Sequence, residues 1–248
     1  MAGLSPREPS LPKPLRELIA TAIGREHRDD PAAGSTGGPA GNARLTAWTG
    51  LVLLVLFLVE VVTLISLHSL LSVHIVVGVI LVPLALLKTA STGWRILRYY
   101  LGNPAYRQAG PPPLVLRLMG PLVILTSLAV LGSGLALVAL GDASHSTLAT
   151  VLGFRIDAVT VHQACFIAWL AITGLHTLAR VVPAVLLAVN ARRVRKAVPG
   201  VRARAAVVAM ALALGGVTGV VVLHDAGAWT HGISFDFDHD HDRDLSIG

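Results

Sequence analysis

The chain has 248 residues, of which 54% are apolar and only 14% are charged, and its mean hydropathy is +0.69. So little polar surface cannot cover a soluble globule of this size, which excludes an ordinary soluble enzyme. The single cysteine, Cys165, excludes a disulfide-stapled secreted domain and a thiolate metal cage within one chain. The formal charge of +6 comes from basic residues that flank apolar segments rather than from one basic face, so we expect no nucleic-acid partner.

Residues 1–44 contain no apolar run long enough for a signal peptide, and they are predicted to form a cytoplasmic tail. Near its start an amphipathic helix is predicted, which would lie on the membrane surface or on a partner; a weakly helical tail is the alternative. Its apolar residues recur at helical spacing: Leu11, Leu15, Leu18, Ile19, Ala22 and Ile23. Residues 29–42 are rich in Gly, Pro, Ala and Ser and predict a flexible linker.

Five later segments approach the length of about 20 apolar residues that crosses a bilayer as a helix. They lie at residues 46–67, 74–97, 115–139, 160–188 and 204–224. We therefore expect an all-α integral membrane bundle of about five transmembrane helices over residues 45–225, with the lipid bilayer as a partner. Lys and Arg gather before the first segment, between the second and third, and between the fourth and fifth. This distribution predicts a multi-pass protein of the cell (plasma) membrane with the N-terminus inside and the C-terminus outside.

Two histidines, His162 and His176, occur 14 positions apart in one apolar segment, VHQACFIAWLAITGLHTLAR. At about 100° and 1.5 Å per residue, both point within about 40° of one helix face, roughly 21 Å apart along the axis. Imidazole is the usual axial ligand of a haem iron buried between helices, and two stacked haems need ligands at two such levels. The pair therefore indicates haem ligation; the alternative is two rings that hydrogen-bond to neighbouring carbonyls.

A second ligand must come from another helix. His74 opens the second apolar segment, which runs in the same direction as the fourth, so His74 and His162 are expected to face each other across one haem b at the outer depth. Gly78, one turn further, leaves room for a porphyrin edge. Fourteen residues after His74 stands Lys88, which can snorkel to the inner face, pair with a haem propionate, or ligate iron as a neutral amine. The sequence thus predicts one haem b, and a second where His176 pairs with Lys88 or another ligand.

These histidines resemble those of membrane-embedded cytochrome b proteins, which include cytochrome b subunits of hydrogenases and formate dehydrogenases and ferric reductase-like haem proteins. Two-haem members of that group carry His-x13-His, or a close variant, on each of two helices. The chain matches this motif at His162 and His176 and half of it at His74, and it departs from it at Lys88. The segment YYLGNPAYRQAGPPPLVLRLMGP is also similar to small actinobacterial membrane cytochromes that resemble partners of molybdopterin oxidoreductases. The resemblance covers about residues 46–190 and implies a membrane electron carrier.

Small residues and one acid interrupt the apolar segments. Five glycines on the third and fifth segments permit close backbone approach or admit a flat cofactor: Gly132, Gly134, Gly215, Gly216 and Gly219. Glu60 is a lone carboxylate about two turns below the outer surface. An acid at that depth is expensive, so it indicates proton uptake or quinone contact, with a neutral hydrogen-bonded side chain as the alternative.

Residues 226–248 are predicted to form an acidic, His- and Asp-rich tail outside the membrane. Carboxylates mixed with imidazoles can hold a divalent ion, and the acidity can also recruit a basic soluble partner. The candidate surface metal site consists of Asp238, His239, Asp240, His241 and Asp242. The alternative is a solvated low-complexity segment.

The sequence carries no recognisable motif for nucleophilic, metalloprotease or nucleotide chemistry. We therefore interpret it as a b-type haem cytochrome that transfers electrons between a carrier, with quinone favoured, and a partner oxidoreductase or larger membrane complex. One rival is a divalent metal-ion transporter or metal-binding membrane protein. The other is a non-catalytic accessory subunit of a membrane complex.

Overall fold

The computed structural model describes residues 11–23, 30–111, 114–190 and 198–226. Long helices dominate it, and the only strands in these ranges form one short hairpin. The elements are α1 (Lys13–Ala22), α2 (Gly38–Thr63), η1 (Leu64–Ser66), α3 (Leu67–Tyr100), α4 (Pro104–Ala109), α5 (Leu114–Leu140), η2 (Gly141–His145), β1 (Ala149–Val151), β2 (Phe154–Ile156), α6 (Ala158–Asn190) and α7 (Val201–Asp225).

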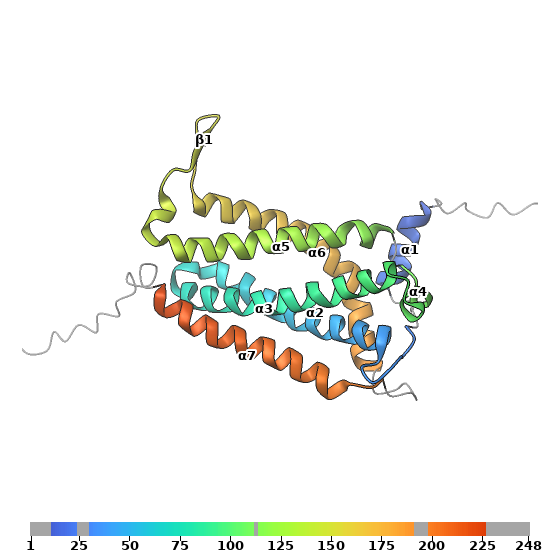
Figure 1. Ribbon diagram of the computed structural model, residues 1–248. Coiled ribbons are helices and arrows are strands. Elements are labelled where there is room, and N and C mark those ends of the chain that lie inside the picture. The colour runs from blue at the N-terminus through green and yellow to red at the C-terminus, as the bar shows by residue number, and fades with distance from the viewer. Residues whose placement is uncertain (1–10, 24–29, 112–113, 191–197, 227–248) are drawn as a thin grey trace, which may run out of the picture.

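Four continuous helical stretches in the described part of the chain are long and apolar enough to cross a membrane. The first spans residues 38–100 and contains both α2 and α3, which η1 joins. These two helices fold back on each other, since Thr46 of α2 hydrogen-bonds Ser91 of α3 at 2.9 Å. The bundle therefore has five long helices in four hydrophobic stretches, and the expected all-α membrane bundle is confirmed (Figure 1).

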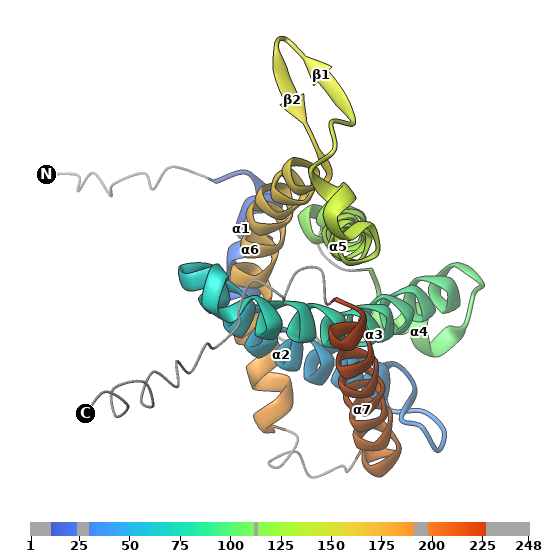
Figure 2. The same ribbon diagram turned by 90° about the vertical axis from the view of Figure 1, so that its left-hand side faces the viewer.

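Two helical hairpins and one further helix make up the bundle. Helix α2 packs along α3, and α5 packs along α6; α7 lies against the side of α3 (Figure 2). Contacts from α2 to α6 and from α3 to α5 join the two hairpins. The predicted amphipathic helix is present as α1, which packs on α6 and α5 and runs across the direction of the long helices (Figure 1).

The start of α2 corrects the expected linker. The helix begins at Gly38 rather than after residue 42, with Gly37 in the left-handed conformation before it and a proline in its first turn. The preceding segment is tied to the bundle, because Arg204 of α7 donates to the backbone oxygen of Thr36 at 3.0 Å. Side-chain bonds of this kind hold a Gly- and Pro-rich stretch that composition alone describes as flexible.

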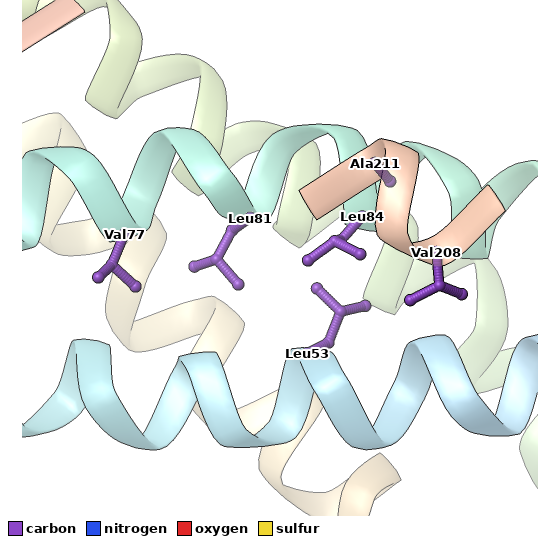
Figure 3. Packing of buried hydrophobic residues seen from close by; sticks show 6 residues of the cluster. All are labelled: Leu53, Val77, Leu81, Leu84, Val208 and Ala211. Atoms are coloured by element: carbon purple, nitrogen blue, oxygen red, sulfur yellow. The ribbon is translucent and has the colours of Figure 1, made fainter. Parts of the chain in front are cut away.

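The core lies where α2, α3 and α7 meet. Leu84 is fully buried, and Leu81 and Leu53 are nearly so. Figure 3 shows this cluster between the three helices: Leu53, Val77, Leu81, Leu84, Val208 and Ala211. Between helices in a bilayer such a cluster is held by van der Waals packing rather than by removal of apolar surface from water, because lipid tails are as apolar as leucine. In this way α7 fixes the position of α3.

Glycines of α7 allow this close packing. A Cβ added at Gly215 would lie 2.8 Å from the Cα of Ile80, and one at Gly219 would lie 3.3 Å from the backbone oxygen of Val76. By contrast, a Cβ at Gly216 would have nothing within 4 Å. The predicted close backbone approach is therefore confirmed at two of the three glycines of α7.

The connection from α5 to α6 forms a β-hairpin that the sequence did not predict. Val151 pairs with Phe154, and Leu152 and Gly153 make the two-residue turn with φ of 50° and 84°. Positive φ at both turn residues suits the right-handed twist of a hairpin. The hairpin stands out from one end of the bundle (Figures 1 and 2).

Helix α6 begins immediately after this hairpin at an acidic cap. The Thr160 hydroxyl and the Thr160 backbone N–H each donate to Asp157 Oδ1 at 2.7 Å. These hydrogen bonds, led by that of the hydroxyl, hold the pKa of the Asp157 carboxyl below its ordinary value of 3.8. Asp157 thus caps the N-terminus of α6 and places a negative charge at the positive end of the helix dipole.

Candidate functional site between two helical hairpins

A cavity of about 360 Å³ lies between α2, α3, α5 and α6, which places it between the two hairpins. Its volume is within the range of small-molecule pockets, about 300–1,000 Å³. Most of its lining is aliphatic or aromatic. The polar side chains that line it are Glu60, His74, His162 and Gln163. A largely apolar pocket with a few convergent polar groups is the usual form of a cofactor site.

The two histidines predicted for the outer level meet at this cavity. The ring centroids of His74 and His162 are 6.4 Å apart, and the rings are nearly perpendicular at 80°. An imidazole nitrogen lies about 1.1 Å from its ring centroid and a metal–nitrogen bond is about 2.0 Å long, so two rings on opposite sides of one metal have centroids about 6.2 Å apart. The observed separation matches that value.

The Nδ1 atom of His74 is held by α2. The Thr63 hydroxyl donates its proton to the backbone oxygen of Glu60 at 2.6 Å. That hydroxyl oxygen lies 3.0 Å from His74 Nδ1 and has only acceptor capacity left, so Nδ1 carries the proton and donates to it. The Oε1 atom of Glu60 lies 3.3 Å from the same nitrogen. These partners orient the ring and leave Nε2 with its lone pair.

The Nδ1 atom of His162 is held in the same manner by α5. The Ser133 hydroxyl donates to the backbone oxygen of Val130 at 3.1 Å, and its oxygen lies 2.9 Å from His162 Nδ1. The proton of this ring is thereby also placed on Nδ1. The hydrogen bonds that place these two rings are made at Nδ1. A ring protonated on Nδ1 keeps its lone pair on Nε2, which is the form in which imidazole can bind a metal.

Two glycines leave space beside the histidines. A Cβ at Gly134 of α5 would lie 3.2 Å from His162 Cε1, and one at Gly78 of α3 would lie 3.2 Å from Glu60 Oε1. Both glycines line the cavity. The absence of side chains at these positions widens the cavity next to each ring, which suits a flat cofactor.

Aromatic residues close the cavity on its inner side. The ring centroids of Phe57 and Trp169 are 4.5 Å apart, and Phe166 stacks on Trp169 at 6.2 Å. The indole Nε1 of Trp169 donates to Ser127 of α5 at 3.1 Å. Trp169 lies seven residues from His162 and seven from His176, so it separates the outer level from the inner level.

The inner level is built differently. Lys88 donates from Nζ to the backbone oxygen of Thr46 at 3.2 Å and lies against the backbone of Gly50. The Nδ1 atom of His176 is buried without a hydrogen-bond partner among the described residues. Lys88 and Arg180 both lie within electrostatic range of this ring. The structure thus places Lys88 near His176, but the amine is bonded to the main chain of α2.

Three other histidines of the described residues do not line the cavity: His68, His145 and His224. His68 and His224 are exposed on their helices, and His145 Nδ1 lies 3.9 Å from Asp157 Oδ2. In the described ranges no group of three or more His, Cys, Asp and Glu residues is arranged to hold a metal ion. The predicted metal site at residues 238–242 lies outside the described residues.

Two hydroxyls that orient the histidines were not predicted from the sequence. Thr63 precedes a helix turn and is almost fully buried, with 2% exposure. Ser133 stands between Gly132 and Gly134, and a hydroxyl flanked by glycines in an apolar helix was a signal for a polar contact with a neighbouring helix. The role of Thr63 had no such signal, because it depends on the turn between α2 and α3.

Compared with known proteins, the chain matches no family model, no curated protein and no solved structure.

Proposed function

We propose that this protein is a membrane cytochrome that binds one haem b between His74 and His162 and transfers electrons. The observation that carries the proposal is the pair of imidazoles with centroids 6.4 Å apart, each with its Nδ1 held by a hydroxyl of its own hairpin. Membrane-buried histidines are costly unless a partner satisfies them, and a metal at Nε2 would satisfy both.

Each polar residue at the cavity would have its own role in binding haem. His74 and His162 would bind the haem iron, and Thr63 and Ser133 would keep both rings in the Nδ1-protonated form. Glu60 next to His74 would adjust the basicity of that ligand. The apolar lining would exclude water from the site. When bound, haem b supplies one-electron chemistry between its ferric and ferrous states.

The buried position of the proposed haem bears on the electron carrier and the partner protein. A lipid-soluble carrier such as a quinone suits a redox group buried in a membrane bundle, and a partner oxidoreductase or larger membrane complex would take or supply the electrons. We propose one haem rather than two, because the Lys88 amine is bonded to the Thr46 carbonyl and His176 Nδ1 has no hydroxyl to orient it.

The test is an absorption spectrum and a haem count on protein purified from cells with adequate haem. We expect a Soret band, an alpha band that appears on reduction, and about one haem per chain. His162→Ala should abolish these bands, whereas His68→Ala, which removes an exposed histidine of the same outer end, should leave them unchanged. Both variants should elute as the wild type does on size exclusion.

Other results would support the rival functions. A wild-type protein without a Soret band that moves divalent ions in proteoliposomes would be a transporter. A protein that keeps its cellular function in the His162→Ala form would be an accessory subunit.

A further inference from the structure

The β-hairpin between α5 and α6 has two chemically different faces. Directly opposed residues of antiparallel strands point to the same side of a sheet, and successive residues along a strand alternate sides. Thr150 pairs with Arg155, so one face carries these two polar side chains. The opposite face is apolar and consists of two cross-strand pairs: Val151 with Phe154 and Ala149 with Ile156. The β-hairpin is therefore amphipathic.

The apolar face is open in the described part of the chain. Phe154 is 75% exposed and Val151 is 51% exposed. Leu152, in the turn that joins the two strands, is 93% exposed. Large apolar side chains gathered on an exposed surface mark a contact with a protein or a membrane. The β-hairpin thus carries an apolar surface that a partner outside the described residues must cover.

The base of the β-hairpin lies where the bundle leaves the bilayer. Helix α6 begins at Ala158, two residues before the predicted span of residues 160–188, which is about 3 Å along a helix. The headgroup layer on each side of a bilayer is about 5–7 Å thick, so α6 begins within that layer. Strand β2 ends at Ile156, two residues before α6. The β-hairpin therefore starts next to the lipid headgroups.

The β-hairpin extends sideways at this level. In Figure 1 it stands across the direction of α5 and is seen edge-on. In Figure 2, which shows α5 nearly end-on, the two strands lie side by side and reach away from the bundle. Its sheet is therefore turned so that one face is directed toward the bilayer and the other toward the water.

We propose that the β-hairpin lies on the outer leaflet of the membrane with its apolar face among the headgroups and the upper ends of the acyl chains. Amphipathic elements bind the membrane interface in this way, with their apolar side inserted at the boundary between headgroups and acyl chains. Under the predicted orientation the leaflet is the outer one. The β-hairpin thus anchors the start of α6 to the lipid surface.

Two further features favour lipid over a protein partner. Leu140 at the end of α5 and Val161 in the first turn of α6 are also exposed, so the apolar surface of the bundle continues toward the β-hairpin. Arg155 on the polar face is in place to meet headgroup phosphates, because a long basic side chain keeps its charge at the interface. The inference depends on the membrane assignment and not on haem.

The test uses the full chain in nanodiscs of mixed phosphatidylcholine and phosphatidylglycerol. Cys165→Ala removes the single native cysteine, and a spin label is then attached in Phe154→Cys or in Thr150→Cys, the matched control on the opposite face. Collisions with oxygen, which concentrates in lipid, and with a water-soluble nickel chelate are measured by power saturation. We expect the label at position 154 to meet more oxygen and less nickel than the label at position 150.

Two results would overturn the proposal. Equal access of the nickel chelate to both labels would show that the β-hairpin stands in water. Protection of the label at position 154 from both oxygen and nickel would show that a protein surface covers it, such as a second copy of the chain. Should Phe154→Cys fail to fold, Ala149→Cys provides a second label on the apolar face. Protein without haem that keeps the expected contrast would support the anchor although the proposed function fails.

Discussion

The outer and inner levels of the bundle share a spacing but not a structure. On α6 the two levels carry His162 and His176, and on α3 they carry His74 and Lys88. At the outer level the ring centroids of two imidazoles lie 6.4 Å apart beside a cavity, and both Nδ1 atoms are hydrogen-bonded. At the inner level one imidazole has a buried Nδ1 without a partner in the described residues, and the lysine is bonded to α2.

The difference shows how a neighbouring helix orients a histidine ring. Helical spacing sets the depth and the face of each ring. The neighbouring helix of the same hairpin then sets the tautomer, because a hydroxyl that has already given its proton to a carbonyl can only accept from the ring. The outer level has such a hydroxyl in each hairpin, Thr63 and Ser133, whereas His176 Nδ1 has none among the residues that the structure describes.

Removal of a histidine at the outer level should have the largest effect on the amount of bound haem. We expect His74→Ala to lose nearly all bound haem, because the substitution removes one of the two proposed iron ligands. Lys88→Met, at the matching position of the inner level, should keep the full haem content. Haem quantitation per polypeptide measures both. Equal losses in the two variants would show that the levels are not distinct.

Loss of an orienting hydroxyl should have an intermediate effect. We expect Thr63→Val and Ser133→Ala each to lower haem affinity by about 10- to 100-fold, the usual cost of removing a group that orients a metal ligand. Haem transfer to apomyoglobin would measure this loss. Ser127→Ala is the control, since its hydroxyl lies on the same helix as Ser133 but accepts from Trp169. An unchanged affinity in both test variants would contradict the role of the hydroxyls.

A methyl group beside His162 should have a smaller effect. In Gly134→Ala the new Cβ would lie 3.2 Å from His162 Cε1, so the ring must shift by a few tenths of an ångström. We expect haem affinity to fall severalfold, with a small shift in the reduction potential measured by spectroelectrochemistry. Gly132→Ala, where nothing lies within 4 Å of the new Cβ, should behave as the wild type. The opposite ranking of these two variants would place the cofactor elsewhere.

The smallest effect concerns the cap that starts α6 above the outer level. The Asp157 carboxyl has a lowered pKa in the folded protein, so its stabilising effect is fully present above its ordinary value of 3.8 and is lost as the pH falls through the lower, folded value. We expect Asp157→Ala to lower the thermal midpoint slightly at pH 6, and the difference from the wild type to shrink below pH 4. Thermal unfolding across pH 3–7 checks this. If the thermal midpoints of the wild type and Asp157→Ala differ by the same amount at every pH, ionisation of the Asp157 carboxyl does not contribute to stability.

Much of the fold could be predicted because it follows from apolar length and helical period. Those properties predicted the five long helices, and with them the shared depth of His74 and His162. The start of α2 at Gly38 could not be predicted, since distant contacts such as Arg204 to Thr36 hold that segment. The place of Arg180 at the inner level was missed for the same reason. Arg180 comes within electrostatic range of Lys88 through the packing of α6 on α2, which no local pattern encodes.

Each hairpin carries one histidine together with the hydroxyl that orients it, Thr63 with His74 and Ser133 with His162. Because a chain is synthesised from its N-terminus, the first hairpin is made before the second. Each half can acquire its ring orientation as it inserts, and the later association of the two hairpins then completes the pocket. Any group that binds in the pocket would contact both hairpins. Its binding would therefore require that the two hairpins have already associated in the membrane.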